Sequence, residues 1–177
     1  DVYKRQPTLL PPGPAEGEAT MQTLLMPLLE RAEATASLQG RPWRGPDRWP
    51  QWIDQPSQDG TIAEIVANLL ENAFRYSPAG CSVGLCLLPD GLCVWDNGPP
   101  IPLEERDLIF ERGARGSTGQ DRAGTGLGLA LARSLAEQQG RKLTLCVEPS
   151  TIAPDLPAQG NAFVLSWPAG ARPDPTT

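Results

Sequence analysis

The clearest pattern of hydrophobic and polar positions lies in residues 61–77, TIAEIVANLLENAFRYS. Apolar residues recur there every three or four positions, the spacing that gathers side chains on one face of a helix. Thr61 and Glu64 have the spacing of a capping box, and Pro78 closes the far end. We predict an amphipathic helix whose buried face carries Ile62, Ile65, Val66, Leu69, Leu70, Ala73 and Phe74.

Three other segments have helical patterns. Residues 23–39 repeat leucines at helical spacing and end at a glycine, and Pro27 inside them is tolerable only near the first turn. Residues 126–139 also end at a glycine, and residues 103–113, LEERDLIFERG, predict a short helix. The polar stretch from 115 to 124 between the last two predicts a mobile loop.

Alternating or continuous apolar runs predict the strands. CSVGLCLL (81–88) and GLCVW (91–95) flank a Pro-Asp-Gly turn and predict a β-hairpin. Residues 143–147 and 162–167 predict two further strands, and residues 40–58 predict short extended pieces. Helices and hairpins mixed in this order predict an α+β fold, a two-layer sandwich with one mixed, mostly antiparallel sheet and helices on one face.

Length and composition limit the number of domains. A chain of 177 residues suffices for one domain with a sizeable core, and its 20 prolines gather at the ends and in loops. We expect residues 1–22 to be a flexible linker or fragment edge and residues 170–177 a flexible tail. The chain begins with Asp1 rather than methionine, and we expect it to be a fragment of a longer protein.

Charge and residue usage exclude several classes of function. A net charge of −6 argues against a nucleic-acid partner, because phosphate contacts need clustered Lys and Arg. No apolar stretch is long enough to span a bilayer and no signal peptide is visible, so we expect a cytoplasmic domain without membrane contact. The four cysteines lie in apolar, strand-like segments without a CxxC pair, which favours buried free thiols over a metal site. The absence of histidine excludes a histidine-based triad or zinc site within the chain.

The polar stripe of the helix at 61–77 is the first candidate site. Glu64, Asn68, Asn72 and Arg75 fall on one side of it, away from the apolar face. A solvated surface explains such a stripe, but asparagine is a poor helix former and two of them stand one turn apart. A carboxamide oxygen suits Mg²⁺, which keeps several waters and bridges to phosphates.

Two loops are further candidates. DNGPPIP (96–102) has the composition of a tight turn, and it also offers a carboxylate at a strand end with Gly98 leaving room for a flat ring. GTGLGLAL (124–131) lacks the Gly-Lys-Ser/Thr of a P-loop and the preceding strand of a dinucleotide fingerprint. It remains a helix start whose exposed N–H groups suit an anion.

In order and spacing these elements resemble the ATP-binding domain of histidine kinases, within the superfamily shared with gyrase, heat-shock-chaperone and mismatch-repair ATPases. NLLENAFRYS (68–77) resembles the N box, DNGPPIP (96–102) the first glycine box and LIFERG (108–113) the F box. GTGLGLALA (124–132) resembles the second glycine box, and GNAFVLSWP (160–168) resembles the closing strand of the family.

The resemblance covers about residues 23–169 and implies the Bergerat type of α+β sandwich, with ATP and Mg²⁺ as its ligands. It implies that Asn72 binds Mg²⁺, that Asn68 and Arg75 support the phosphates, and that Tyr76 packs beside the nucleotide.

The resemblance also assigns roles to the loops. Asp96 would bind the adenine amino group, with Gly98 and Ile101 along the ring. Arg112 and Arg115 resemble the basic residues that reach the γ-phosphate, and residues 113–123 match the lid. The hinge and phosphate-facing helix start would be Gly124, Thr125, Gly126, Leu127, Gly128 and Leu129.

Two departures from the family pattern are visible. Pro100 stands where the first glycine box usually has its second glycine, and proline fixes φ and removes a donor. The histidine that the family phosphorylates is absent, so the resemblance implies an upstream dimerisation domain that carries it and, indirectly, a response regulator receiver domain.

Whether the parent protein is anchored in a membrane stays open. Two alternatives also stay open: a stand-alone protein-serine kinase of the anti-sigma-factor type, and a degenerate nucleotide-binding or partner-docking module.

Overall fold

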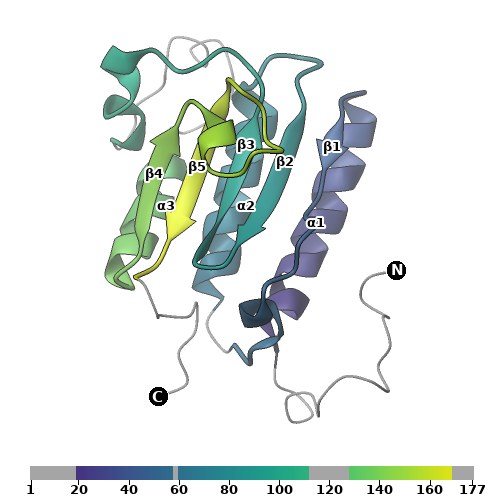
Figure 1. Ribbon diagram of the computed structural model, residues 1–177, viewed down its shortest axis with the longest axis vertical. Coiled ribbons are helices and arrows are strands. Elements are labelled where there is room, and N and C mark those ends of the chain that lie inside the picture. The colour runs from purple at the N-terminus through teal and green to yellow at the C-terminus, as the bar shows by residue number, and fades with distance from the viewer. Residues whose placement is uncertain (1–18, 58–59, 112–127, 169–177) are drawn as a thin grey trace.

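A five-stranded sheet forms one layer of the structure, and three helices form the other (Figure 1). The computed structural model describes residues 19–57, 60–111 and 128–168, and all counts here refer to those residues. The helices are α1 (Met21–Leu38), α2 (Thr61–Tyr76) and α3 (Gly128–Gln138). The strands are β1 (Trp43–Arg44), β2 (Val83–Leu88), β3 (Gly91–Asp96), β4 (Lys142–Cys146) and β5 (Asn161–Ser166). Short 3₁₀ turns are η3 (Gln51–Asp54), η4 (Leu103–Glu105), η5 (Leu108–Phe110) and η7 (Pro149–Thr151).

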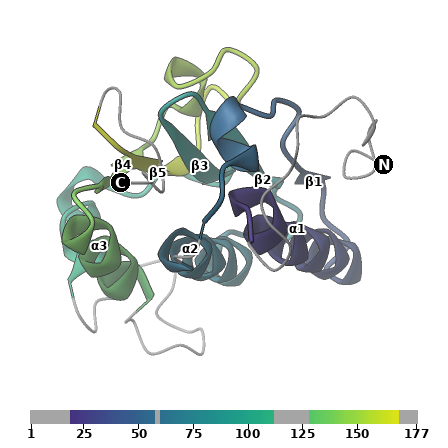
Figure 2. The same ribbon diagram turned by 90° about the horizontal axis from the view of Figure 1, so that it is seen from below.

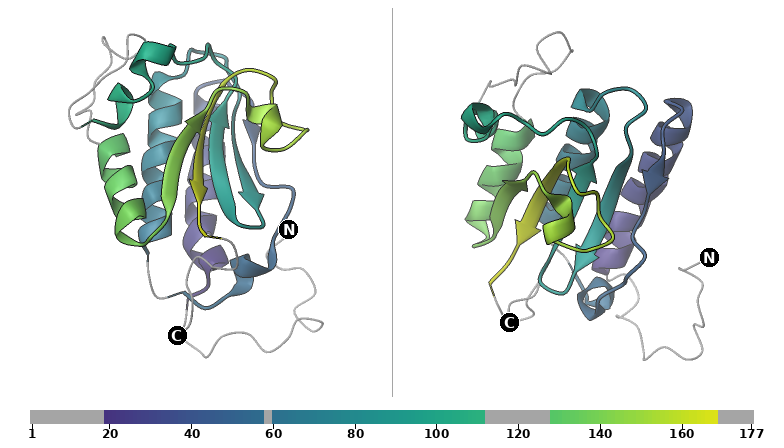
Figure 3. Two further views of the ribbon diagram at one scale, coloured as in Figure 1. Left: turned by 60° about the vertical axis from the view of Figure 1, so that its left-hand side comes forward. Right: turned by 45° about the horizontal axis from the view of Figure 1, so that its top comes forward.

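The sheet has the strand order β1-β2-β3-β5-β4. β1 runs parallel to β2, and the other neighbouring pairs are antiparallel. Figure 2 shows the three helices in one row on a single face of the sheet, with the loop between β4 and β5 on the opposite side. The views in Figure 3 show the same two layers from the side. The predicted α+β sandwich with a mixed, mostly antiparallel sheet is confirmed.

The main core lies between the sheet and the helices. All seven apolar residues predicted for the buried face of α2 are buried there, because the 3.6-residue period directs them toward the sheet. Each fully buried aliphatic side chain of this kind stabilises the fold by about 1.5–3 kcal/mol. β3 is buried at all six positions, so the middle of the sheet is covered on both faces. Its last residue, Asp96, is therefore carried to the end of the core.

The outer face of the sheet has a smaller apolar cluster. Trp95 lies across Gly84 of the neighbouring strand, and the guanidinium of Arg44 lies 5.9 Å from the Trp95 ring centroid. Arg44 also donates a hydrogen bond to the backbone carbonyl of Asp155 (2.7 Å) and forms an ion pair with its carboxylate. This contact holds the β4–β5 loop over the outer face.

Two helices end in the same way, one hundred residues apart. Gly40 and Gly140 adopt φ angles of 65° and 69°, which glycine accepts without strain. The backbone N–H of Arg41 then donates to the carbonyl of Ala36 (3.0 Å), and that of Arg141 to the carbonyl of Ala136 (2.9 Å). Both terminations follow the predicted glycine stops, and the arginine after each glycine is buried.

Helix starts differ from the predictions. α1 begins at Met21, where Thr20 and Thr23 form reciprocal side-chain to backbone hydrogen bonds, so Pro27 lies in the second turn instead of the first. The capping box of Thr61 and Glu64 is wrong: the N-cap is Gly60, and the Thr61 hydroxyl accepts a hydrogen bond from the Gln139 amide (3.1 Å). Thr61 therefore stands one residue inside the helix, and its hydroxyl takes part in a contact with the residue that follows α3.

Other local predictions also need correction. Residues 103–113 form the turns η4 and η5 in their described part, instead of one helix, because each turn closes after three residues. All four cysteines are free, but Cys81 precedes β2, and both it and Cys146 are only partly buried.

In the described part of the chain no helix combines the length and apolar character needed to cross a membrane.

Gly84 provides a test of this packing. A Cβ at this position would lie 2.3 Å from the Trp95 ring and 2.8 Å from the backbone oxygen of Arg44. We expect Gly84→Ala to lower the free energy of unfolding by about 1–3 kcal/mol, as overpacking does in a filled core. Gly45→Ala is the control, since the nearest atom to its Cβ position, Trp43 Nε1, lies 3.5 Å away, at ordinary van der Waals distance. Urea unfolding measures both, and an unchanged midpoint for Gly84→Ala would contradict the close packing of Trp95 on β2.

Candidate functional site

The candidate site begins at the carboxylate of Asp96, which is only 6% exposed. Its Oδ1 atom accepts a hydrogen bond from the backbone N–H of Gly98 (2.9 Å) and one from the side-chain amide of Asn161 (3.3 Å). Both of these hydrogen bonds, which come from described residues, end on Oδ1. Oδ2 is therefore the oxygen that can accept a hydrogen bond from a ligand.

Asn161 holds the loop that follows Asp96. It stands directly opposite Asp96 in the register of β3 and β5, and its amide also donates to the carbonyl of Pro99 (2.9 Å). Its Oδ1 accepts from the backbone N–H of Ile101 (2.8 Å). One side chain thus fixes three points of the loop at 96–101, on both sides of the residue that departs from the family pattern, Pro100.

Two glycines permit the close approach of backbones at this point. A Cβ on Gly98 would lie 3.0 Å from both Asp96 Oδ1 and Pro78 Cδ. A Cβ on Gly160 would lie 2.1 Å from the backbone oxygen of Asp96. The first lets the loop fold back onto the carboxylate, and the second lets β5 begin against the end of β3.

Burial governs the electrostatics of Asp96. Removal of the carboxylate from water raises its pKa above the ordinary value of 3.8, and the hydrogen bonds from Gly98 and Asn161 and the charge of Arg41 act in the opposite direction. The folded state therefore contains a carboxylate that water would solvate better. Such a group gains most from a ligand that donates a hydrogen bond to it.

The second part of the site lies between α2 and α3. Asn68 and Asn72 are half-buried and one turn apart on α2, and within the described residues neither side-chain amide has a hydrogen-bond partner. A Cβ on Gly128 would lie 3.9 Å from Asn68 Oδ1, so the first residue of α3 stands beside this amide. The contact between Gln139 and Thr61 at the other ends shows that the two helices are antiparallel. The start of α3 thus stands beside the middle of α2, at Asn68.

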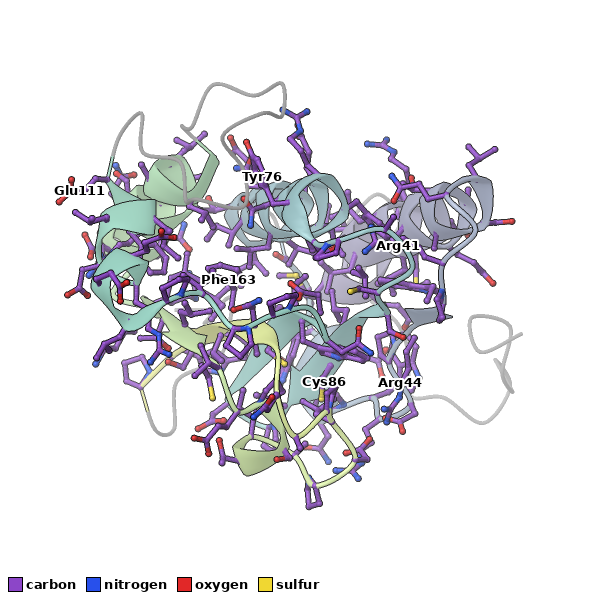
Figure 4. All side chains as sticks on the ribbon, turned by 90° about the horizontal axis from the view of Figure 1, so that it is seen from above. Arg41, Arg44, Tyr76, Cys86, Glu111 and Phe163 are labelled. Carbon is purple, nitrogen blue, oxygen red and sulfur yellow. The ribbon has the colours of Figure 1, made fainter. Side chains whose placement is uncertain are left out.

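Other predicted residues have different surroundings. Arg75 forms an ion pair with Glu71 (2.8 Å), and both line a groove of about 400 Å³ between α1 and α2. Tyr76 is half-buried, and Figure 4 shows it on the side of α2 that faces α3. Ile101 packs against the main core, while Leu129 is buried within it. The structure thus brings together Asp96, Gly98 and Ile101 in one loop and Asn68 with Gly128 between two helices.

Several predicted residues lie outside the described part of the chain. They are the γ-phosphate candidates Arg112 and Arg115, the lid at 113–123, and the residues Gly124, Thr125, Gly126 and Leu127 of the second glycine box.

Sequence reasoning missed Arg41, which is 7% exposed and lies between α1 and α2 (Figure 4). Its guanidinium donates to the carbonyls of Phe74 (3.3 Å), Pro78 (2.9 Å) and Cys81 (2.8 Å), and to the hydroxyl of Ser77 (2.5 Å). It therefore satisfies the end of α2 and holds the loop whose Pro78 contacts Gly98. The repeated tripeptide Gln-Gly-Arg at 39–41 and 139–141 was the available signal.

Asn161 was also missed as a site residue. Its only signal was its position in the GNAF segment that resembles the closing strand of the family. Its role depends on the register of β3 and β5, which pairs Asn161 with Asp96 although they are 65 positions apart in the sequence.

A protein-family comparison identifies a known domain in this chain. The model described as "Histidine kinase-, DNA gyrase B-, and HSP90-like ATPase" matches residues 58–171. This match covers more than half of the chain, including α2, the loop after Asp96, α3 and β5.

Relatives and solved structures are similar to this chain in the same way. The sensor histidine kinase Hik2 of Thermosynechococcus vestitus is 35% identical over 85% of this chain and 39% of the relative. The sensor protein KdpD of Escherichia coli is 34% identical over 66% of this chain and 13% of the relative. The mycobacterial sensor histidine kinase MprB aligns with a TM-score of 0.59 at 26% identity, covering 81% of this chain and 95% of that one. The catalytic domain of histidine kinase ThkA aligns with a TM-score of 0.61 at 21% identity, covering 85% and 95%, and supports the fold alone.

The buried carboxylate predicts an unusual pH dependence of stability. Because the folded-state pKa of Asp96 is raised, the stability it contributes is present below its ordinary pKa and is lost as pH rises through the folded-state value. We therefore expect Asp96→Asn to unfold at a higher temperature than the natural protein at pH 7. The difference should close as the solution is acidified below pH 3.8, where the carboxyl is protonated in both states.

Thermal unfolding followed by circular dichroism at a series of pH values measures this difference. Asp90→Asn, at an exposed position in the β2–β3 turn, is the matched control. A lower unfolding temperature for Asp96→Asn at pH 7 would mean that the carboxylate is a net stabiliser and would contradict the argument.

Proposed function

Since the chain belongs to the family of histidine kinase-, DNA gyrase B- and HSP90-like ATPases, we propose that it binds Mg-ATP and donates the γ-phosphoryl group to a histidine on a separate dimerisation domain. The relatives are named sensor histidine kinases, and the chain is the ATPase domain that such kinases carry. It spans 39% and 13% of the length of the two relatives described above. The activity of the whole protein is therefore part of the proposal.

The observation that carries the proposal is the buried carboxylate of Asp96. Its Oδ1 accepts hydrogen bonds from Gly98 and Asn161, and its Oδ2 is available to accept one from a ligand. Adenine offers an exocyclic amine that can donate a hydrogen bond to Oδ2. The adjoining Gly98 and Ile101 belong to the loop held by Asn161, so they would line the ring at a fixed distance from the carboxylate. Solvent cannot easily replace the ligand at a carboxylate that is 6% exposed.

The amides of α2 fit a divalent cation that is shared with phosphates. Asn72 would supply a neutral oxygen ligand to Mg²⁺, and Asn68, one turn earlier, would face the phosphates beside Gly128. Among the described residues no cluster of three or more acidic, thiol or imidazole groups could hold a metal by itself. That composition suits an ion whose remaining ligands are phosphate and water. When bound, the cation would neutralise charge that develops on the phosphates during transfer.

The remaining roles fall on residues around the phosphates. The helix start at 124–129, whose backbone N–H groups suit anions, would face the phosphates, and Arg112 and Arg115 would reach the γ-phosphate. Residues 113–123 would close over the nucleotide as a lid. Arg75 would also bind a phosphate, in place of its ion pair with Glu71. Tyr76 would pack beside the nucleotide. We propose about 23–169 as the extent of this domain, to which α1 adds the buried Met21 at its N-terminal side.

The partners follow from the absence of histidine in the 177 residues. The phosphoryl acceptor would come from the dimerisation helices of the same protein, and a response regulator receiver domain would take the group from there. No nucleic-acid partner and no membrane contact of this domain are proposed. We propose a cytoplasmic location for the domain.

The two alternatives have weaker support. A protein-serine kinase of the anti-sigma-factor type resembles the hydrolytic relatives in keeping a glutamate four residues before the metal-binding asparagine, and this chain has Asn68 there. The departure at Pro100 is the feature that favours a degenerate module, but Asn161 bonds both Pro99 and Ile101 and so holds the loop on either side of this proline. Hydrogen bonds thus hold this loop although it lacks the usual second glycine.

Nucleotide binding tests the site directly. We expect Mg-dependent ATP binding in the micromolar to millimolar range, weakened at least about tenfold, or about 1.4 kcal/mol, by Asn72→Ala and by Asp96→Asn. Gln138→Ala removes an exposed amide from the end of α3 and should leave affinity unchanged. Isothermal titration calorimetry with and without Mg²⁺ measures the affinities, and full affinity in both site variants would refute the assignment.

Phosphoryl transfer tests the class of enzyme. Mixed with its upstream dimerisation helices and labelled ATP, the chain should label a histidine of those helices while remaining unlabelled itself. Arg115→Ala should slow transfer more than it weakens ATP binding, because its proposed partner is charge on the moving phosphate, whereas exposed Arg31→Ala should do neither. Acid-labile label on the helices would support a histidine kinase. Label on Ser or Thr would support the serine-kinase alternative.

A further inference from the structure

Two cysteines stand directly opposite each other on the outer face of the sheet. The register of β2 and β3 pairs Cys86 with Cys93, and opposed residues of antiparallel strands have Cα atoms about 4.5–5.5 Å apart. A disulfide needs Cα atoms about 4.4–6.8 Å apart, so the backbone already meets this requirement. Both side chains belong to the outer cluster with Trp95, Ala153 and Leu156, whereas their neighbours Leu85 and Leu92 face the helices. Figure 4 shows Cys86 on the side of the sheet opposite to the helices.

The two thiols differ in access and acidity. Cys86 is 9% exposed and Cys93 is fully buried. The neighbouring Cys93 thiol lowers the pKa of the Cys86 thiol, and the proximity of Cys86 together with burial raises the pKa of Cys93. Cys86 therefore carries the thiolate more readily and is the sulfur that a small reagent reaches first.

We propose that Cys86 and Cys93 form a peroxide-oxidisable dithiol site, in which Cys86 is the attacking sulfur and Cys93 resolves the intermediate as a cross-strand disulfide. The Cys86 thiolate attacks one oxygen of hydrogen peroxide, the O–O bond breaks, and hydroxide leaves and takes up a proton as water. Cys93 then attacks the sulfur of the resulting sulfenic acid, and a second water leaves as the S–S bond forms. The two thiols lose two electrons and two protons, and the peroxide gains them.

The surroundings restrict the oxidant to a small molecule. The loop between β4 and β5 covers this cluster, and Arg44 holds the loop through Asp155. A hydroperoxide can enter a site of this exposure, whereas a tripeptide disulfide such as oxidised glutathione cannot approach the sulfur in line. Cys146 lies on β4, two strands from β3 in the sheet, at about 10 Å by the usual strand spacing, which is too far for either cysteine to bond with it.

The proposal is independent of the proposed nucleotide site, because both sulfurs lie on the face of the sheet that the helices do not cover. Oxidation should raise the unfolding temperature, since the cross-link constrains the unfolded hairpin. Affinity for Mg-ATP should stay within about twofold, or about 0.4 kcal/mol.

Intact-mass measurement of the folded chain after treatment with hydrogen peroxide tests the site. We expect a mass lower by about 2 Da that dithiothreitol reverses, with a peptide joining Cys86 and Cys93 in a non-reducing digest. In Cys93→Ser the unresolved Cys86 should instead gain about 32 Da as sulfinic acid, and Cys86→Ser should protect Cys93 from oxidation. Cys146→Ser is the matched control and should retain the loss of about 2 Da.

Three results would overturn the proposal: an unchanged mass, a disulfide joining any other pair, or equal oxidation of Cys93 in Cys86→Ser. Circular dichroism of each variant before treatment establishes that the chain is folded, so a failure of the disulfide cannot arise from unfolding.

Discussion

The arrangement of the site depends on one buried charged group, the carboxylate of Asp96 at the end of β3. Asp96 needs hydrogen-bond donors, because an unpaired carboxylate removed from water costs several kcal/mol. The donors come from the loop that follows it and from Asn161 of the next strand, and both must lie in contact with the carboxylate. Gly98 and Gly160 are the residues that allow this approach, since side chains there would meet the carboxylate or the backbone of Asp96 itself.

The helix layer is arranged around the same end of the sheet. α2 uses one face for the core and leaves two amides on another face, and α3 runs antiparallel to it so that Gly128 stands beside Asn68. Arg41 connects this layer to the carboxylate loop, since it bonds the end of α2 and the carbonyls of Pro78 and Cys81. Its charge also favours the ionised form of Asp96. One buried arginine thus supports both parts of the proposed nucleotide site.

Local patterns predicted the elements well and their contacts poorly. The buried face of α2 followed from its period, and the glycine stops at Gly40 and Gly140 were correct, because both depend on residues within one or two turns. The capping box at Thr61 failed because the N-cap is Gly60, one residue earlier, whose carbonyl accepts a hydrogen bond from the backbone N–H of Glu64 (2.9 Å). The helix expected at 103–113 failed in its described part because the chain turns there twice within a few residues.

By itself the sequence determined the apolar face of α2, the β2–β3 hairpin, and a carboxylate at the end of a strand followed by a glycine turn. These features depend on spacing along the chain, which sets the direction of neighbouring side chains. Only the tertiary structure decided that Asn161 would stand opposite Asp96, that Arg41 would bond the end of α2, and that the pair Cys86 and Cys93 of the hairpin would lie on the outer side of the sheet. Those contacts depend on strand register and helix packing, in which single residues meet only after the whole hydrophobic core has formed.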